Sequence, residues 1–545
     1  MIRRFGYAFA GLIVCLGIAG PIRRDRTSPE PQITYHLTPH PPSAASPART
    51  TVEIRIDNPS AGTPIQFAMP AWTPGDYRIQ DHGRSVRNLR VFDGGPIPVR
   101  DAGAGRWAIT PRSSQPVTLT YDLPNTRPGL FTENVDVQRD MAFYNGAAVF
   151  LYMVGRTDEP VSLRITSPPR FDPPCVPLKL EGDGSFTAPS YHALADTPVL
   201  LGRRTEGRFV VSGKEHRVAA FGRDGRTAID PYVEILRRIV QAGDAYMGGL
   251  PYARYYLFLD MDGRGGGLEH ADSARLAIPW QAPPGMMARF IAHEFFHLWN
   301  VKRIRPKELA EIDYSRAAIT PNLWFCEGVT EYVAGILSVR AGLMTEEEYE
   351  SALAQSAAAW GRSSRGRRTT ADDASRRIWS GGTSMGSGGV SVYLSGEMIG
   401  LCLDLELLRR TNGAAGLREL LRDLMSRHGA PKPGYDDDGI RACAIRLGGP
   451  EMGAYYDRLC RSVRPLPIGE CLESVGLRMR PADEALGLEL IDGATDAQRR
   501  LRRLWLYGTA EVALTPSPKR SPKSVRTSNN RPHRIGGRTV LEGTS

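Results

Sequence analysis

Short runs of alternating apolar and polar residues dominate the chain between residues 34 and 204. Residues 52–56 and 117–121 alternate with period two, as expected for strands with one buried face. Glycine, proline, asparagine and aspartate recur between the runs, where turns are expected. The pattern predicts a β-sandwich-like N-terminal domain over residues 30–205.

After residue 228 the apolar positions change to helical spacing. Tyr232, Ile235 and Ile239 form an apolar stripe, and Pro231 suits the first turn of a helix. Further helices are predicted over residues 288–299, 321–341, 391–408, 417–428, 440–447 and 453–463, and strands over 255–261 and 274–278. We therefore predict a multidomain α+β protein whose mainly helical second domain spans residues 206–470.

The predicted helix 288–299 contains an HExxH motif formed by His293, Glu294 and His297. Residues four apart share one face of a helix, so both imidazoles can bind a single ion. Glu294 lies beside them and can reach a water held on that ion. A zinc ion bound in this way, with one open position, serves hydrolysis of a polarised carbonyl group. The motif also recurs by chance, in which case the two histidines belong to an ordinary core.

Two glutamates in the predicted helix 321–341 could supply a third metal ligand. Glu327 follows Trp324 and Phe325, whose aromatic side chains indicate that this turn faces inward. Glu331 lies one turn further on and is the alternative. Either could also be a solvated helix charge. We expect His293, His297 and Glu327 to hold one zinc ion per chain.

Two further motifs could contact a substrate. Gly265, Gly266 and Gly267 precede Glu269 and would let a backbone approach a ligand closely, although a hairpin turn also explains the glycines. Tyr393, near the start of the predicted helix 391–408, could donate a hydrogen bond to an oxyanion. A core tyrosine explains the residue equally well.

The net charge of +10 is concentrated in the tail, residues 515–545, which is rich in proline, serine and arginine. This tail contains seven Lys or Arg residues and one acidic residue, and we expect it to be disordered. The rest of the chain is nearer neutrality, so we do not expect a nucleic-acid-binding enzyme. Residues 1–20 combine a basic start with a short apolar run, which predicts a signal peptide or an uncleaved membrane anchor.

Six cysteines follow Cys15, and none of them is spaced as CxxC. A zinc site built from cysteines is therefore not expected. Cys443, Cys460 and Cys471 are close enough in sequence to be disulfide candidates, and free buried thiols are the alternative.

The fourteen residues from His293 to Pro306 resemble the zinc helix of the glycyl aminopeptidase family, gluzincin metallopeptidases that often carry a PDZ domain. The segment around Glu327 resembles the family's third-ligand helix, which implies that Glu327 is the ligand. The segment from Gly266 and Gly267 to Glu269 resembles the substrate-binding strand, which implies that Glu269 binds the substrate's α-amine. Tyr393 resembles the tyrosine that stabilises the tetrahedral intermediate, although Ser395 stands where the family has lysine.

The resemblance covers residues 34–480 and implies a thermolysin-like catalytic domain. The C-terminus departs from the family pattern. A PDZ domain is expected there, but residues 471–514 are short and turn basic, so we predict a degenerate remnant and carry no peptide-tail binding over.

The motifs together predict a zinc-dependent aminopeptidase that acts on peptides with a free N-terminus, with Gly or Ala preferred by the family. A zinc endopeptidase with the same site and a non-catalytic zinc-retaining binding protein are the alternatives. The N-terminal pattern predicts a periplasmic or secreted enzyme, without a stable membrane span unless residues 1–20 are retained. The sequence indicates no oligomeric state.

Overall fold

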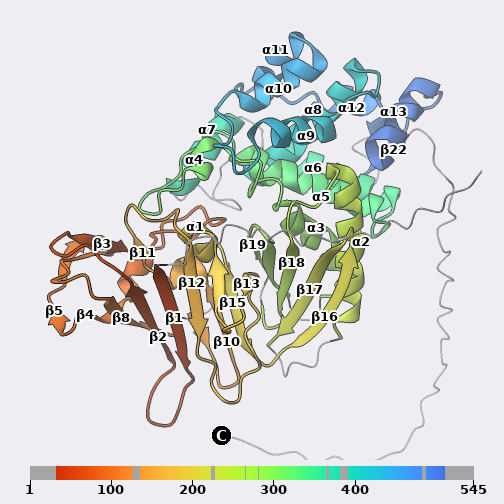
Figure 1. Cartoon of the computed structure of the whole chain (residues 1–545). Coiled ribbons are helices and arrows are strands. Elements are labelled where there is room, and N and C mark those ends of the chain that lie inside the picture. The colour runs from red at the N-terminus through yellow and green to blue at the C-terminus, as the bar shows by residue number, and fades with distance from the viewer. Residues whose placement is uncertain are drawn as a thin grey trace, which may run out of the picture.

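The computed structural model describes residues 32–126, 135–222, 228–263, 265–279, 282–363, 368–380, 391–480 and 486–509. The predicted signal peptide or anchor, residues 1–20, and the predicted basic tail, residues 515–545, lie outside these ranges. The described residues form a sheet-rich N-terminal domain and a mainly helical C-terminal part, which lie side by side (Figure 1).

The N-terminal domain is built around an eight-stranded sheet in the order β13-β14-β12-β1-β2-β8-β4-β5. At its centre, β1 (Ile33–His40) pairs antiparallel with β2 (Arg49–Ile56), which pairs antiparallel with β8 (Val117–Pro124). Side chains in β1 alternate between buried and half-buried, as the sequence pattern predicts. The remaining strands of this sheet are β4 (Arg87–Phe92), β5 (Pro96–Ile97), β12 (Val161–Ile165), β13 (Lys179–Leu180) and β14 (Phe186–Ala188).

Two smaller sheets complete this domain. One contains β11 (Tyr152–Met153), β3 (Ile65–Ala68), β7 (Arg106–Ile109) and β6 (Arg100–Gly103), in that order. The other contains β15 (Pro198–Gly202), β10 (Met141–Asn145) and β9 (Val135–Val137). Buried side chains from all three sheets contribute to one apolar cluster, which is the core of the domain.

A five-stranded sheet begins the C-terminal part, in the order β16-β17-β18-β20-β19. Its strands are β16 (Thr205–Val211), β17 (Lys214–Phe221), β18 (Arg254–Asp260), β20 (Ser273–Ala277) and the edge strand β19 (Gly267–Glu269). The helices α2 (Asp230–Met247) and α3 (Ala288–Phe296) lie beside this sheet (Figure 1). On its other side, Phe221 stacks on Phe143 of β10 with ring centroids 5.3 Å apart, which joins the two parts of the chain.

Three helical segments position the candidate site. α3 carries the HExxH motif, and the π-helical turn η5 (Trp324–Val329) leads into α5 (Thr330–Arg340). α8 (Val392–Arg410) crosses η5 so closely that a Cβ atom at Gly328 would overlap the backbone of Gly396. The two glycines therefore allow a backbone-to-backbone contact that fixes η5 against α8.

Further helical segments lie in both parts of the chain. They are α1 (Tyr191–Ala195), α4 (Lys307–Ala310), α6 (Glu346–Ser363), α7 (Ala371–Arg377), α9 (Leu417–His428), α10 (Gly439–Gly448) and α11 (Glu451–Cys460), and the 3₁₀ turns η1 (His82–Ser85), η2 (Gly146–Ala148), η4 (Pro284–Met287) and η6 (Ile378–Ser380). Of these, α1, η1 and η2 lie in the N-terminal domain.

The C-terminal range 471–514, for which we predicted a PDZ remnant, packs into the helical part where the structure describes it. It follows the start of α12 (Ile468–Glu473) and contains the paired strands β21 (Leu477–Met479) and β22 (Leu488–Leu490) and the helix α13 (Asp496–Tyr507). Trp505 of α13 is buried and donates a hydrogen bond from Nε1 to the hydroxyl of Tyr332 in α5, at 2.6 Å. These elements share one apolar core with α3 and α5, so this segment does not form a separate module.

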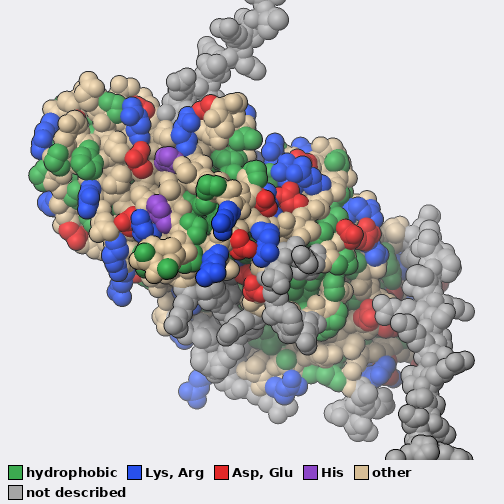
Figure 2. Space-filling view, turned by 90° about the horizontal axis from the view of Figure 1, so that it is seen from below, with side chains coloured by type: hydrophobic (Ala, Val, Ile, Leu, Met, Phe, Trp, Pro, Cys, Tyr) green, Lys and Arg blue, Asp and Glu red, His purple; other side chains and the backbone are tan. Residues whose placement is uncertain are grey.

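Charged side chains of both signs are interspersed on the face shown in Figure 2. Among the described residues, no helix combines the length and the apolar character that a membrane span requires. The six cysteines after Cys15 are all buried as free thiols, which agrees with the alternative to disulfides.

Candidate metal centre and active site

The two histidines of the HExxH motif face each other at the end of α3. Their Nε2 atoms are 3.0 Å apart, and both side chains are buried. The helix ends at Phe296, with His297 as its C-cap, and does not extend to residue 299 as predicted. His293 and His297 nevertheless share one face, because the helical spacing holds as far as the cap.

The opposite ring nitrogens are both held by acceptors. His293 Nδ1 lies 2.8 Å from Glu331 Oε2, and His297 Nδ1 lies 2.8 Å from the carbonyl oxygen of Asn300. A carboxylate and a carbonyl can only accept, so both Nδ1 atoms carry the hydrogen. In the neutral rings, two Nε2 lone pairs then face each other at 3.0 Å, and only a proton or a cation can relieve their repulsion.

Glu327 brings a carboxylate to the same place. Its Oε2 atom lies 3.5 Å from His297 Nε2 and 3.8 Å from His293 Nε2. Ligands of tetrahedral zinc, at about 2.0–2.1 Å from the ion, lie roughly 3.3 Å apart. One ligand atom from each of His293, His297 and Glu327 lies within 4.8 Å of the others, and all three residues are buried. The donor set therefore fits a zinc ion.

Glu331, the alternative ligand, lies outside this group of three residues and instead accepts a hydrogen bond from one of its histidines. Glu327 lies in the π-helical turn η5 and faces the histidine pair, while Glu331 follows in α5 and contacts His293 Nδ1. Such π turns occur often at functional sites. The helix predicted over 321–341 is thus interrupted by this π-helical turn at the candidate site.

Glu294 lies beside the trio and is almost fully buried. Burial raises its carboxyl pKa to about 7. The backbone of Gly267 lies so close that a Cβ atom there would overlap the Glu294 carboxylate. The glycine-rich strand therefore lies directly against the Glu294 carboxylate. The sequence alone could not distinguish this arrangement from a simple hairpin turn.

Glu269, at the end of β19, is 4% exposed, and its Oε1 atom has no hydrogen-bond partner among the described residues. Its carboxylate groups with Glu294 and His297, with ligand atoms within 4.8 Å of one another. Lys302 Nζ lies 3.9 Å from Oε1 but is engaged at 2.9 Å by Asp196. A buried carboxylate oxygen without a donor can accept a cationic group from a substrate.

Tyr393 stacks on one of the three candidate metal ligands. Its ring centroid lies 6.1 Å from that of His293, at an interplanar angle of 25°. Burial and the nearby Glu327 raise the pKa of its phenol well above 10, so the hydroxyl remains a donor. Its proposed contact with an oxyanion stays a prediction.

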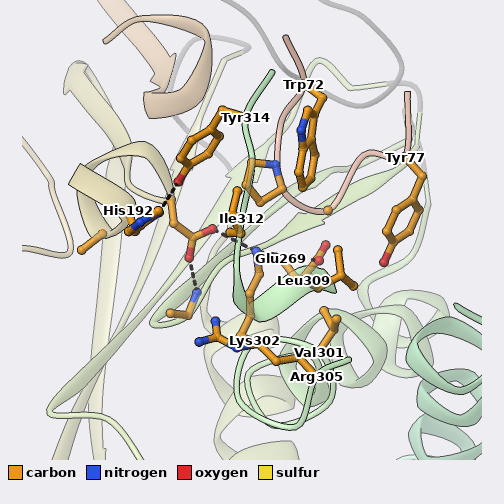
Figure 3. A pocket seen from close by; sticks show the side chains of 15 residues that line it. Trp72, Tyr77, His192, Glu269, Val301, Lys302, Arg305, Leu309, Ile312 and Tyr314 are labelled. Carbon is orange, nitrogen blue, oxygen red and sulfur yellow. Dashed lines mark hydrogen bonds and ion pairs between the residues drawn. The ribbon is translucent and has the colours of Figure 1, made fainter. Parts of the chain in front are cut away.

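A cavity of about 190 Å³ adjoins Glu269 (Figure 3). Apolar side chains such as Trp72, Val301 and Ile312 contribute to its walls, together with the charged residues Asp196 and Lys302. Trp72 lies on a turn of the N-terminal domain, so both parts of the chain enclose this space.

Sequence reasoning missed three residues that hold the site together. Tyr77 donates a hydrogen bond to Glu327 from the N-terminal domain, Asn300 supplies the carbonyl to His297, and Lys302 lies beside Glu269. Tyr77 falls in the segment 70–78, whose Pro70, Pro74 and Gly75 are typical of a turn but assign no contact. Asn300 and Lys302 follow the motif directly, but nothing in their spacing assigns them a partner.

Comparisons with known proteins give two family models and a solved structure that resemble the chain. The family model described as M61 glycyl aminopeptidase matches residues 286–399, and the model described as Peptidase M61 N-terminal domain matches residues 42–203. Among solved structures, the chain is similar to an aminopeptidase N family protein from Idiomarina loihiensis, with a TM-score of 0.75 and 23% sequence identity over 82% of this chain and 79% of that chain. At this identity the likeness shows the fold alone. No curated protein matches the chain.

Proposed function

Because the chain belongs to the M61 glycyl aminopeptidase family and is a metallopeptidase, we propose that it is a zinc-dependent aminopeptidase that removes single residues from the N-termini of peptides. The same proposal covers the finer features of the fold, a β-sandwich in the sheet-rich domain and a thermolysin-like helical part. It also includes a periplasmic or secreted location, which only the pattern of residues 1–20 supports.

His293, His297 and Glu327 would hold the zinc ion. When bound, zinc acts as a Lewis acid on a carbonyl and lowers the pKa of a water molecule. The chain's own groups prepare this site, because Glu331 and the Asn300 carbonyl fix both histidines with their Nε2 atoms turned inward.

Glu294 is the proton carrier of the proposed reaction. Its carboxylate accepts a proton from the attacking water and later delivers it to the leaving amine. In the metal-free protein burial raises the pKa of this carboxyl to about 7, and a zinc ion beside it would lower that pKa and favour the carboxylate that takes up the proton. Tyr393 keeps its hydroxyl hydrogen and can donate it toward the developing oxyanion.

The observation that carries the exopeptidase assignment is the buried Oε1 atom of Glu269, which accepts no hydrogen bond among the described residues although Lys302 Nζ lies 3.9 Å away. A free α-ammonium would supply the missing donor and a compensating charge. An acetylated N-terminus offers neither the charge nor three donors, and Lys302 Nζ is held by Asp196 at 2.9 Å, so Glu269 Oε1 would still lack a hydrogen-bond donor. Gly266 and Gly267 would let the substrate backbone lie along β19, and Gly266 has a positive φ of 102° that favours glycine.

The preference for Gly or Ala at the N-terminus rests on the family alone.

An experiment that tests the exopeptidase assignment compares hydrolysis of a free-amine peptide with that of its N-acetylated form. We expect the acetylated peptide to be cleaved at least about 100-fold more slowly. Equal rates would indicate an endopeptidase that uses the same metal centre. No cleavage of either peptide by folded, zinc-loaded protein would indicate a binding protein.

A further inference from the structure

The two oxygen atoms of the Glu327 carboxylate contact residues of different domains. Its Oε2 atom faces the two histidines, whereas its Oε1 atom accepts a hydrogen bond of 2.7 Å from the Tyr77 hydroxyl. Tyr77 precedes Glu327 by 250 residues and belongs to the N-terminal domain. Its side chain is 6% exposed, so this bond is shielded from water.

We propose that Tyr77 is a positioning residue of the metal centre, which holds Glu327 Oε1 so that Oε2 points to the ion. The N-terminal domain thereby completes a metal site whose three ligands all lie in the other part of the chain. This inference rests on the proposed function, because it takes zinc as the ion.

The turn that carries Tyr77 is tied to the backbone of the helical part. Trp72 Nε1 donates a hydrogen bond to the carbonyl oxygen of Asp313 at 3.0 Å. The backbone amide of Ala71 donates to the carbonyl oxygen of Tyr314 at 2.8 Å. These two bonds join the start of the turn to consecutive residues across the domain boundary. The backbone that carries the phenol is therefore fixed relative to the metal ligands.

Charged and polar side chains fix the other side of the turn. Asp76 accepts hydrogen bonds from Arg78 at 2.7 and 2.9 Å and from Gln80 at 2.5 Å, and its backbone amide donates to the Thr73 carbonyl. Gly75 has a φ of 106°, which favours glycine, and a Cβ atom there would lie 2.8 Å from Glu269 Oε2. The turn thus touches two carboxylates of the candidate site, with Gly75 at Glu269 and Tyr77 at Glu327.

Aromatic packing holds the phenol ring itself. Tyr77 meets Trp379 edge-on, with centroids 5.9 Å apart at 81°, and Trp379 meets Trp72 in the same manner at 5.1 Å and 88°. Figure 3 shows Trp72 and Tyr77 projecting from one turn beside Glu269. Because a ring packed in this way has little freedom, its hydroxyl is preorganised toward Glu327.

The chemistry of the bond suits a positioning role. A phenol has an ordinary pKa of about 10 and is neutral near pH 7, so Tyr77 keeps its single hydrogen and donates it to Glu327 Oε1. A neutral donor on one oxygen stabilises the charged carboxylate and leaves the other oxygen free for a metal.

The test compares Tyr77→Phe with Tyr35→Phe in the full-length protein. Tyr35 is also a buried tyrosine of the N-terminal domain, and its hydroxyl donates to the Leu151 carbonyl at 2.8 Å, away from the site. Zinc affinity is measured by competition with a chelator of known affinity. We expect Tyr77→Phe to bind zinc 10- to 100-fold more weakly than the parent, and Tyr35→Phe to stay within twofold of it.

A second measurement follows the ligand geometry directly. We expect the visible spectrum of cobalt-substituted Tyr77→Phe to shift relative to the parent, and that of Tyr35→Phe to match it. Equal zinc affinity and an unchanged spectrum in Tyr77→Phe would overturn the inference, even if activity fell, since the phenol would then act on the substrate. A parent protein that binds no zinc would overturn the proposed function as well.

Discussion

The Nδ1 atom of His293 lies 2.8 Å from Oε2 of Glu331, so Glu331 orients a candidate metal ligand instead of being one. Arg289 contacts the other oxygen of Glu331 at 2.8 Å and also bonds Glu397 at 2.5 Å. Three charged side chains from α3, α5 and α8 thereby form a chain that ends on the histidine. The position of His293 depends on all three helices.

Replacing Glu331 with alanine should weaken zinc binding by 10- to 100-fold, because His293 loses the acceptor that fixes its ring. Glu331→Gln keeps an oxygen acceptor and should recover most of the affinity. A competition titration of both variants measures the effect. If the alanine variant binds zinc as tightly as the parent, the hydrogen bond does not contribute to the metal centre.

Zinc binding should release protons and strengthen as the pH rises from 6 to 8. Burial lowers the pKa of His293, but Glu327 and Glu331 outweigh it and raise that pKa well above 6.5 in the metal-free protein. The pKa of His297 is also raised, because Glu327 outweighs burial there. Zinc requires neutral imidazoles, so protons compete with it below these pKa values.

The expected slope is a tenfold gain in affinity per pH unit for each proton released. Competition titrations at pH 6, 7 and 8 measure this slope, and a pH-stat counts the protons directly. A flat dependence would show that both histidines are already neutral before zinc arrives.

Glu269→Gln should lower kcat/KM on an alanine anilide by at least about 30-fold, which is roughly 2 kcal/mol for losing one partner of a buried charge pair. The amide is nearly isosteric, so we expect the fold and the zinc affinity to be unchanged. Steady-state kinetics with the free and N-acetylated substrates measure the effect. Selectivity for the free amine that survives the substitution would remove Glu269 from the amine site.

Trp505→Ala should destabilise the helical part by about 3–5 kcal/mol, because it leaves a cavity and removes the bond to Tyr332. Urea unfolding followed by circular dichroism measures the loss. Arg499→Ala, at a half-exposed side chain of the same helix, should change stability by no more than about 0.5 kcal/mol. Separate unfolding of α13 without loss in the rest would indicate an independent module.

The candidate ligands could be predicted from the sequence because local periodicity determines which side chains share a helix face. Helical spacing places His293 and His297 on one face, and the buried Trp324 beside Glu327 correctly indicated that this turn faces inward. The π-helical turn that contains Glu327 leaves no such signal in the sequence, and it packs closely on α8.

Contacts between distant segments could not be predicted in the same way. Tyr77 reaches Glu327 only through the packing of two domains, and no periodicity encodes how they meet. The same limit applies to α13. Its apolar positions Leu501 and Trp505 have helical spacing, but the sequence does not show which core they join.

The most direct test of the central claim is zinc reconstitution of the metal-free enzyme on a panel of aminoacyl anilides, beside Glu294→Ala. We expect zinc to restore cleavage of the Gly or Ala anilide in the parent. In Glu294→Ala we expect equal zinc binding but at least about a 100-fold lower kcat, because the proton carrier is missing. Cleavage that persists without zinc or without Glu294, or no cleavage of any anilide by folded, zinc-loaded protein, would contradict the account.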